Sequence, residues 1–411
     1  MRIVFLCHYF PPEGNAPAAR TFEHAKRWVA EGIDVTVITS TPNVPHGRVY
    51  PGYRNRLWQL EYLDGVQVIR VWTYVAANSG TLRRTLNYLS FMISASIAGI
   101  FCKRPRAVLA TSPQFFCGWA GVILSRLKQV PLILEIRDIW PDSIAAVGAI
   151  SQPTTLRFLS YLEQLMYRAA DSIVTVGNGY QQALIERKVP RKKISIVPNG
   201  ADLDRFSPQT PGQGVTLTPN HRETSDVFRC VYIGTVGMAS RLDLLIAAAE
   251  TLENRGDKSI ELLIVGDGAD RNRLEKKVAD KGIQNLEFTG LVSKSEIPTI
   301  MENSDACLVH LREDPLFRTV LPSKMFEAMA MKKPVILAVP GAAAKILEQA
   351  EAGLTIRPEN HLDLLNAIER LKTNPELSSK LGRNGRAFTE SKYNRDYFAK
   401  DYLARTIRKY Q

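Results

Sequence analysis

The residues best suited to bind an anion lie together in the stretch from Leu321 to Pro334. Pro322 closes an extended segment, and Ser323 is expected to cap a helix whose first turn contains Lys324. The first amides of a helix and its positive dipole end attract negative charge, and a hydroxyl and an ammonium group would add to that attraction. This combination predicts a site for a diphosphate at Pro322, Ser323 and Lys324.

Glu327 follows one turn later and points the same way as Ser323. At about 1.5 Å per residue its carboxylate lies about 6 Å further along the helix axis, where it could accept hydrogen bonds from two hydroxyls of a ribose. A capped core helix with one surface lysine and one buried glutamate explains the same segment. Taken alone, the segment favours that simpler interpretation, because capped helices are common.

Length and composition indicate an ordinary globular chain with two domains. The chain has 411 residues, of which 45% are hydrophobic and 23% charged, enough for two apolar cores. Its five cysteines are widely separated within apolar runs and have no zinc-ligand spacing, so we expect reduced, buried thiols in a cytoplasmic protein. The first apolar run, Met1–Leu6, is too short for a signal peptide and suits a first strand.

The formal charge of +12 is concentrated in the first half of the chain. Residues 1–205 contain 24 Lys and Arg against 14 Asp and Glu, a net of +10, whereas residues 206–411 contain 29 against 27, a net of +2. A basic half can face nucleic acid, an anionic membrane surface or anionic small molecules. No stacking-aromatic or helix-turn-helix pattern accompanies the charge, which disfavours nucleic acid.

Strands and helices alternate along both halves, as in parallel sheets covered on both faces. In the first half, strands are expected at Arg2–His8, Asp34–Thr39, Val66–Val71, Ala107–Ala110, Leu132–Glu135, Ser172–Val176 and Ile194–Val197, with a helix at Ala18–Gly32. In the second half, strands are expected at Phe228–Ile233, Ile260–Val265, Leu286–Thr289, Ala306–His310 and Val335–Ala338, with helices at Leu242–Glu253, Arg271–Lys281 and Lys294–Asn303.

A segment rich in Pro, Thr, Gly and Gln, residues 209–226, separates the two halves and has the composition of a linker. We therefore expect an α/β chain of two Rossmann-like domains, residues 1–205 and 206–385. The helical tail after residue 361 is longer than the second sheet needs, so residues 386–411 are expected to return to the first domain.

The loop after the first strand, Tyr9–Pro17, is a second candidate site. Ligands of doubly wound sheets gather at loops that leave the carboxyl ends of strands. Gly14 would let the backbone approach a ligand, with Glu13 and Asn15 beside it. A rigid proline-rich turn explains the same residues equally well.

The segment Leu82–Phe101 has the pattern of an amphipathic helix with basic residues at both ends. Apolar residues recur at helical spacing at Leu82, Leu86, Leu89, Ile93, Ile97 and Ile100. The apolar part is shorter than the roughly 20 residues that cross a bilayer. A core helix explains the stripe equally well, but the net charge of +10 on the same half favours contact with an anionic membrane.

Taken together, six motifs of this chain resemble the retaining glycosyltransferases of family 4, which have the two-domain GT-B fold with a central cleft and use nucleoside-diphosphate sugars. The motifs are Phe10–Arg20, Glu135–Asp142, Val197–Asp202, Tyr232–Gly237, Leu263–Gly268 and Pro322–Ala330. Within that family the chain looks most similar to bacterial enzymes of O-antigen, capsule and exopolysaccharide assembly, including N-acetyl-L-fucosamine transferases.

The resemblance implies roles for individual residues. It places the ribose on Glu327, the distal phosphate on the amides near Ser323 and Lys324, and the base on the backbone from Gly290 to Val292. It places the diphosphate beside Arg241, in the loop that contains Gly237, and the leaving phosphate over Gly14. Three positions differ from the family pattern: Thr319 replaces its first glutamate, Met238 an arginine and Arg137 a histidine.

The expected chemistry needs mainly positioned cations. Negative charge grows on the leaving phosphate, so Lys324, Arg241, Ser323 and the Gly14 backbone would lower the barrier without a metal or other cofactor. Asp138 is the candidate to orient or deprotonate the acceptor hydroxyl, with Glu13 second; a strand-end cap or a partner of Arg137 is an equal explanation for Asp138.

The resemblance therefore implies transfer of a hexosyl or N-acetylhexosaminyl group, from a UDP-sugar rather than a GDP-sugar, to a saccharide on a polyprenyl diphosphate. Such an enzyme would be cytoplasmic and would associate with the inner face of the cytoplasmic membrane. A sugar-nucleotide epimerase of the same fold and a non-catalytic nucleotide-sugar binding protein remain alternatives.

Overall fold

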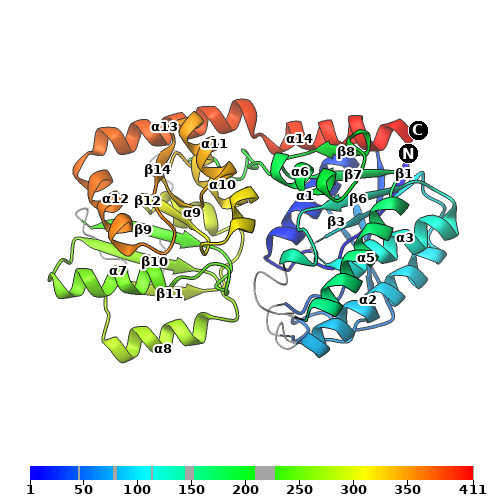
Figure 1. Ribbon diagram of the computed structural model, residues 1–411, viewed down its shortest axis with the longest axis horizontal. Coiled ribbons are helices and arrows are strands. Elements are labelled where there is room, and N and C mark those ends of the chain that lie inside the picture. Colours follow the sequence, from blue (N-terminus) through cyan, green and yellow to red (C-terminus); the bar gives the residue numbers. More distant parts are fainter. Residues whose placement is uncertain (45–46, 77–80, 113, 144–151, 209–226, 411) are drawn as a thin grey trace. The chain divides into compact units, whose positions relative to one another are not determined.

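The computed structural model describes residues 1–44, 47–76, 81–112, 114–143, 152–208 and 227–410, which form two compact units (Figure 1). Unit 1 holds Met1–Pro198 and Asp396–Gln411, and unit 2 holds Asn199–Arg395. The chain thus passes between units at 198/199 and 395/396, where the sequence predicted 205/206 and 385/386. The reason is a local pairing: the Ala201 amide donates to the Tyr393 carbonyl, and the Arg395 amide to the Ala201 carbonyl. The predicted linker lies outside the described residues.

Unit 1 is built on an eight-stranded sheet in the order β3-β4-β2-β1-β5-β6-β7-β8. All described pairings are parallel except β3 with β4. The strands are β1 (Arg2–Leu6), β2 (Asp34–Ser40), β3 (Trp58–Leu63), β4 (Val66–Val71), β5 (Ala107–Thr111), β6 (Leu132–Ile136), β7 (Ser172–Thr175) and β8 (Ile194–Ile196). The sequence predicted all of them but β3, an edge strand whose side chains alternate between exposed and half-buried.

Crossover helices connect these parallel strands. They are α1 (Ala16–Ala30), α2 (Thr81–Phe101), α3 (Phe115–Lys128), α5 (Pro153–Ala169) and α6 (Asn178–Glu186). Helices α2 and α3 pack side by side, and both also contact strands of the sheet. Because parallel strands need such crossovers, the sheet is covered and its central strands are buried.

The C-terminal segment from Asp396 onward belongs to unit 1 and packs on α1, whereas residues 386–395 belong to unit 2. Helix α14 (Arg395–Tyr402) and the π-helical turn Leu403–Ile407 follow the last crossing. The Trp28 indole nitrogen donates to the Ala399 carbonyl at 2.9 Å, and the rings of Trp28 and Tyr402 meet edge to face with centroids 5.1 Å apart. Apolar burial therefore holds the end of the chain on unit 1.

Unit 2 is built on a six-stranded parallel sheet in the order β11-β10-β9-β12-β13-β14. Its strands are β9 (Phe228–Ile233), β10 (Ile260–Val265), β11 (Leu286–Gly290), β12 (Ala306–His310), β13 (Val335–Ala338) and β14 (Gly353–Thr355). Its helices are α7 (Asp243–Asn254), α8 (Arg271–Lys281), α9 (Ile297–Glu302), α10 (Ser323–Ala330), α11 (Ala342–Ala350), α12 (His361–Thr373) and α13 (Pro375–Lys392). This strand order is that of dinucleotide-binding Rossmann sheets.

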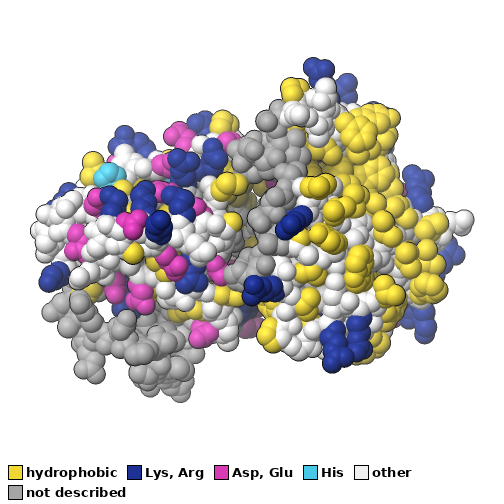
Figure 2. Space-filling model, turned by 90° about the horizontal axis from the view of Figure 1, so that it is seen from below, with side chains coloured by type: hydrophobic (Ala, Val, Ile, Leu, Met, Phe, Trp, Pro, Cys, Tyr) yellow, Lys and Arg dark blue, Asp and Glu magenta, His cyan; other side chains and the backbone are white. Residues whose placement is uncertain are grey.

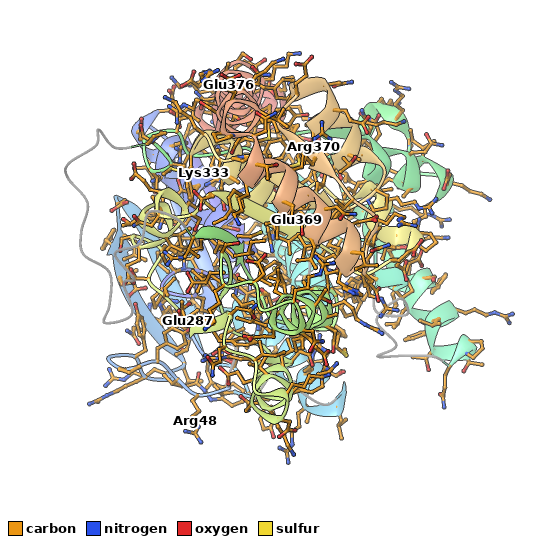
Figure 3. The ribbon with its side chains drawn as sticks, turned by 90° about the vertical axis from the view of Figure 1, so that its left-hand side faces the viewer. Arg48, Glu287, Lys333, Glu369, Arg370 and Glu376 are labelled. Atoms are coloured by element: carbon orange, nitrogen blue, oxygen red, sulfur yellow. The ribbon has the colours of Figure 1, made fainter. Side chains whose placement is uncertain are left out.

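Alternation along β9 divides the unit 2 core into two apolar clusters. Cys230 and Tyr232 face a cluster formed with α7, α8 and α12, whereas Val231 and Ile233 face one formed with α9, α10 and α11. Outside these layers the helices carry charge: Glu369 and Arg370 lie on α12 and Glu376 on the first turn of α13 (Figure 3). Glu369 pairs with Arg255 at 3.2 Å, which links α12 to the end of α7.

The thiols follow the prediction: all five cysteines are free, and all but Cys102 are buried. In the described parts of the chain, no helix has both the length and the apolarity to cross a bilayer.

Tyr402 tests the packing of the returning segment. Its side chain is fully buried, and among the described residues its hydroxyl has no hydrogen-bond partner. We expect Tyr402→Ala to lower the free energy of unfolding by about 3–5 kcal/mol, whereas Tyr402→Phe should stay within about 1 kcal/mol of wild type, because it removes an unpaired buried group. Urea unfolding measures both. Exposed Tyr397→Ala is the control, and an equal loss in that variant would contradict the assignment.

Candidate functional site

The centre of the unit 2 sheet has the geometry of a ligand site. Strands β9 and β12 are neighbours, but the chain leaves β9 toward β10 and leaves β12 toward β13, on opposite sides. Doubly wound sheets bind ligands outside the carboxyl ends of two such strands. Here Gly234 follows β9 and His310 ends β12.

Lys324 is held over the end of β9. Its ammonium lies 3.9 Å from the centroid of the Tyr232 ring, a cation–π contact, and the Tyr232 hydroxyl donates to the Thr235 carbonyl at 2.9 Å. A Cβ at Gly234 would lie 2.6 Å from Lys324 Nζ, so a larger residue there would displace the ammonium from its present place, and the φ of +148° at Gly234 also favours glycine. The structure thus brings the predicted cation to the carboxyl edge of the sheet. Tyr232, which orients it, was not predicted.

Glycine backbones pack directly against one another beside this lysine. A Cβ at Gly266, whose φ is +136°, would lie 2.0 Å from the Gly234 carbonyl oxygen, and one at Gly268 would lie 2.3 Å from that of Val236. No side chain fits in these positions. The loops after β9 and β10 are therefore held together with their amide groups close to the site.

Helix α10 presents its N-terminus at the same edge. The helix begins at Ser323, and Pro322 occupies the cap position with an extended backbone, so no side chain caps this end. The prediction that Ser323 caps the helix is therefore wrong, because the extended Pro322 already supplies the non-helical residue that precedes the first turn. Met325, Phe326 and Met329 bury the opposite face of the helix. The first turn carries Ser323 and Lys324 as predicted.

Glu327 lies one turn further, half-buried, with one carboxylate oxygen 3.7 Å from Nη2 of Arg395. The Arg395 guanidinium also donates to the Gly200 carbonyl at 2.6 Å. Residues from three distant segments thus meet at Glu327. The sequence predicted the carboxylate but not Arg395, because nothing in the local pattern links it to α10.

The loop after β9 carries Arg241 in a left-handed conformation, with φ of +43°. Its half-exposed guanidinium lies 3.5 Å from the Glu359 carboxylate. Non-glycine residues rarely adopt this backbone conformation outside turns and functional sites. Within the same loop, the Gly237 amide donates to Ser240 Oγ at 3.4 Å.

His310 fixes this loop through two hydrogen bonds. The sequence did not predict this residue. Its Nδ1 donates to the Ser240 carbonyl at 2.6 Å, and its Nε2 accepts from the Glu359 amide at 3.0 Å. Burial lowers the pKa of His310, so the imidazole is neutral, as these two bonds require. One buried ring therefore ties both partners, Arg241 and Glu359, to the end of β12.

The predicted base-binding backbone follows β11. Gly290 has φ of +76°, and its carbonyl accepts from the Gly266 amide at 2.9 Å. A Cβ at Gly290 would lie 2.5 Å from Nη1 of Arg271, a cation that sequence reasoning did not assign to the site. Val292 is half-buried two residues further on. Thr319, at the position of the family's first glutamate, donates its hydroxyl to the Leu316 carbonyl at 3.0 Å.

In unit 1, Glu13 lies in the loop after β1, and its side chain points into the protein rather than toward solvent. This carboxylate is buried and accepts hydrogen bonds from the amides of Asn43 and Val44 at 2.9 and 3.1 Å. Burial raises the pKa of Glu13 to about 7. Gly14 beside it is exposed, and Asn15 caps α1 by accepting from the Ala18 amide.

Asp138 follows β6 at the same carboxyl edge of unit 1. Burial raises the pKa of its carboxyl to about 6. Arg137, its proposed salt-bridge partner, instead donates from its guanidinium to the Ser112 carbonyl at 3.0 and 3.1 Å. The explanation of Asp138 as a partner of Arg137 is therefore not supported by this geometry.

Glu163, on α5, lines the same small cavity as Asp138 and was not predicted. The cavity has a volume of about 10 Å³ and is also lined by Phe115, Trp140 and Tyr167. That volume is about the size of one water molecule. The Tyr167 hydroxyl donates to Glu163 at 2.6 Å, and burial raises the pKa of Glu163 to about 7. Two carboxyl groups that exchange protons near neutral pH thus meet at one cavity.

Comparison with known proteins adds family information to this geometry. Residues 15–200 match the model of a glycosyl transferase 4-like domain, and residues 218–388 match that of the glycosyl transferases group 1. The chain is 25% identical over 338 residues to the putative colanic acid biosynthesis glycosyl transferase WcaI of Escherichia coli, which covers 80% of this chain and 81% of WcaI.

Solved structures show the fold. Sucrose-phosphate synthase from Thermosynechococcus elongatus matches with a TM-score of 0.73 at 17% identity, over 99% of this chain and 98% of that one. HepE from Anabaena, in complex with UDP-glucose, matches with a TM-score of 0.70 at 16% identity over the whole of both chains. The fold is GT-B, which confirms the predicted fold class.

The carboxyl groups of Asp138 and Glu163 in unit 1 allow a test in which the direction of a pKa change is predicted. Carboxyl ¹³C shifts followed against pH should show Asp138 titrating near pH 6 and Glu163 near pH 7. Tyr167→Phe removes the hydrogen bond that favours the ionised Glu163, so the pKa of Glu163 should rise while that of Asp138 stays unchanged. A fall in the pKa of Glu163 in this variant would contradict the assignment.

Proposed function

We infer that this chain transfers a sugar from a nucleoside diphosphate with retention of configuration. It is a glycosyltransferase with the GT-B fold, in which a glycosyl transferase 4-like domain is followed by a group 1 domain. The position of Lys324 carries the proposal. Its ammonium lies at the ligand edge of the unit 2 sheet, on the first turn of a helix that no side chain caps. A diphosphate is the anion that suits this edge.

The donor site proposed for unit 2 follows from the groups around that lysine. The diphosphate would bind the first turn of α10 at Pro322, Ser323 and Lys324, with Gly237 and Arg241 on its other side. Arg241 is half-exposed and its pairing with Glu359 is long, so the guanidinium can exchange a carboxylate for a phosphate. Glu327 would accept from the ribose, and the backbone from Gly290 to Val292 would hold the base.

Catalysis in this proposal is stabilisation of the leaving group. When the bond between the sugar and the phosphate breaks, positive charge develops on the sugar and negative charge on the phosphate. Lys324 and Arg241, fixed before the reaction begins, would neutralise that phosphate, together with the amides at the start of α10. These cations make a metal unnecessary in the mechanism.

Asp138 is the proposed group that orients or deprotonates the acceptor hydroxyl. A base works best when its pKa lies near the working pH, and burial brings Asp138 to about 6. Glu13 is the second candidate, but its carboxylate is already engaged by the amides of Asn43 and Val44. Those bonds fit a role in positioning the loop after β2 better than one in proton transfer.

The donor, the acceptor and the product of the reaction are also proposals. We propose a UDP-sugar as donor, a polyprenyl-diphosphate saccharide as acceptor and bacterial surface polysaccharide as product, made at the inner face of the cytoplasmic membrane. The name of WcaI and the UDP-glucose bound to HepE support this choice. A hexosyl or N-acetylhexosaminyl group, such as N-acetyl-L-fucosamine, is the proposed cargo. The epimerase and the non-catalytic binding protein remain the alternatives.

Removal of the Lys324 ammonium tests the donor site. We expect Lys324→Met to lower the rate of transfer about 10²–10³-fold, as loss of one preorganised charge does elsewhere, and to weaken UDP binding. Exposed Lys345 on α11 provides the control, because Lys345→Met removes the same charge from the same unit. Calorimetric UDP titration and turnover in the presence of EDTA measure the two effects. Equal UDP affinity and turnover in wild type and Lys324→Met would contradict the site.

Asp138→Asn tests acceptor activation. We expect UDP binding to persist while transfer falls at least about 10²-fold, and wild-type transfer to rise with pH through about 6, as the carboxyl ionises. Release of UDP should require the lipid-linked acceptor. Turnover of the sugar nucleotide without acceptor would favour the epimerase, and binding without release would favour the non-catalytic protein. Asp142→Asn, an exposed neighbour, is the control.

A further inference from the structure

Helix α2 presents an apolar face to solvent. Five of the six residues whose spacing the sequence identified are 45–73% exposed, namely Leu82, Leu86, Ile93, Ile97 and Ile100, and Leu89 is half-buried. Phe101 at the end of the helix is 75% exposed. The buried side of the helix is formed instead by residues such as Tyr88, Phe91, Ala95 and Ala98. The explanation of the stripe as a core face is therefore wrong, because the apolar stripe is the outer one.

The exposed face continues onto α3. A Cβ at Gly99 would lie 2.5 Å from Leu124, so the two helices are in close contact at that point. The ammonium of Lys128 donates to the Ile100 and Cys102 carbonyls, which joins the C-terminal ends of both helices. Leu127 and Ile123 on α3 are exposed beside them. Figure 2 views the molecule from the side on which α2 lies, and apolar side chains gather over this part of unit 1.

The charge of this region has one sign. No Asp or Glu occurs between Asp64 and Glu135, whereas the same 70 residues contain eight basic residues. They are Arg70, Arg83, Arg84, Lys103, Arg104, Arg106, Arg126 and Lys128. Two of them, Arg104 and Arg106, line an open groove of about 470 Å³ together with Gln129 and Tyr410. An apolar face with cations at both ends of its helix complements an anionic lipid surface.

The same charge argues against a second copy of the chain as the occupant. A two-fold symmetric interface brings one patch against itself. With no carboxylate along residues 65–134, two copies of this region would oppose cations to cations.

We propose that the outer face of α2, with Ile123 and Leu127 of α3, lies flat in the headgroup boundary of an anionic membrane. Lys103, Arg104, Arg106 and Arg126 contact lipid phosphates at one end of the helix, and Arg83 does so at the other. At about 1.5 Å per residue the 21 residues of α2 span about 30 Å along the surface. The proposal deepens the membrane association that the proposed function includes, because it names the docking surface.

Helix α2 also packs against the start of the loop after β1. On the buried side of the helix, Tyr88 contacts His8 edge to face with centroids 5.4 Å apart, and its hydroxyl lies 3.4 Å from that of Tyr9. Phe91 packs on His8 in the same way at 4.8 Å. The helix that meets the lipid is therefore the helix against which the loop of Glu13 and Gly14 is built. A lipid-linked acceptor would be delivered to that loop from the membrane.

Vesicle cosedimentation of the full chain tests the surface without donor or acceptor, so its failure would leave the proposed transfer reaction standing. The probes are vesicles of phosphatidylcholine alone and with phosphatidylglycerol. We expect binding to the mixed vesicles that falls steeply between 0.1 and 1 M salt, since the Debye length shortens from about 10 to about 3 Å. Ile93→Asp/Ile97→Asp should reduce binding at least about tenfold, because each charge would have to enter the apolar layer.

Two controls keep the result interpretable. Leu362→Asp changes an equally exposed leucine of unit 2 and should bind as wild type does. Lys103→Gln/Arg106→Gln should bind roughly tenfold or more weakly at low salt and lose most of the salt dependence. Unchanged UDP-induced thermal stabilisation shows that each variant is folded.

Three outcomes would overturn the proposal. The first is binding of Ile93→Asp/Ile97→Asp as tight as that of wild type. The second is failure of wild type to bind the anionic vesicles at low salt. The third is a wild-type dimer in lipid-free buffer that Ile93→Asp/Ile97→Asp converts to monomer, which would assign the face to a second copy.

Discussion

The direct contact between the backbones of Gly234 and Gly266 is the constraint on which the unit 2 site depends. With a Cβ position only 2.0 Å from the Gly234 carbonyl, no side chain can separate the loops after β9 and β10. The resulting gap above Gly234 has room for the Lys324 ammonium against the Tyr232 ring. A full positive charge is thereby fixed at the edge of a sheet before any ligand arrives, and preorganisation of this kind is what electrostatic catalysis needs.

In unit 1 the main constraint is that charged side chains are buried. Arg20 pairs with Glu135 inside the unit and donates to the Val197 and Pro198 carbonyls, so the buried guanidinium is fully engaged where the chain leaves β8. A buried pair of this kind contributes little net stability, but loss of one partner is costly. At Asp138 and Glu163 burial is the larger effect and raises the pKa of each carboxyl, although Glu163 also accepts a hydrogen bond from Arg187 at 3.3 Å. The difference separates carboxylates that hold the fold from carboxyl groups that can move protons.

The sequence predicted the elements well and the contacts between distant residues poorly. Strands β1, β9, β10 and β12 are apolar runs bounded by glycine or polar residues, so their positions follow from local pattern. Glu163, Arg271 and Arg395 carry no such signal, because each reaches its place through tertiary packing. Ser323 shows the limit of local rules: it has the type of a capping residue, yet the extended Pro322 takes that position.

Helix α2 shows why periodicity alone leaves function open. A 3.6-residue repeat identifies an apolar stripe but does not say whether protein, lipid or water covers it. The second, independent quantity is charge. Burial of the stripe in a protein core would not account for the absence of Asp and Glu from the 70 residues around it. The structure leaves that stripe exposed, and the proposed docking on an anionic membrane would give both observations one common cause. In any chain whose apolar stripe and one-sided charge fall on the same element, the structure is needed only to decide which face of that element is exposed.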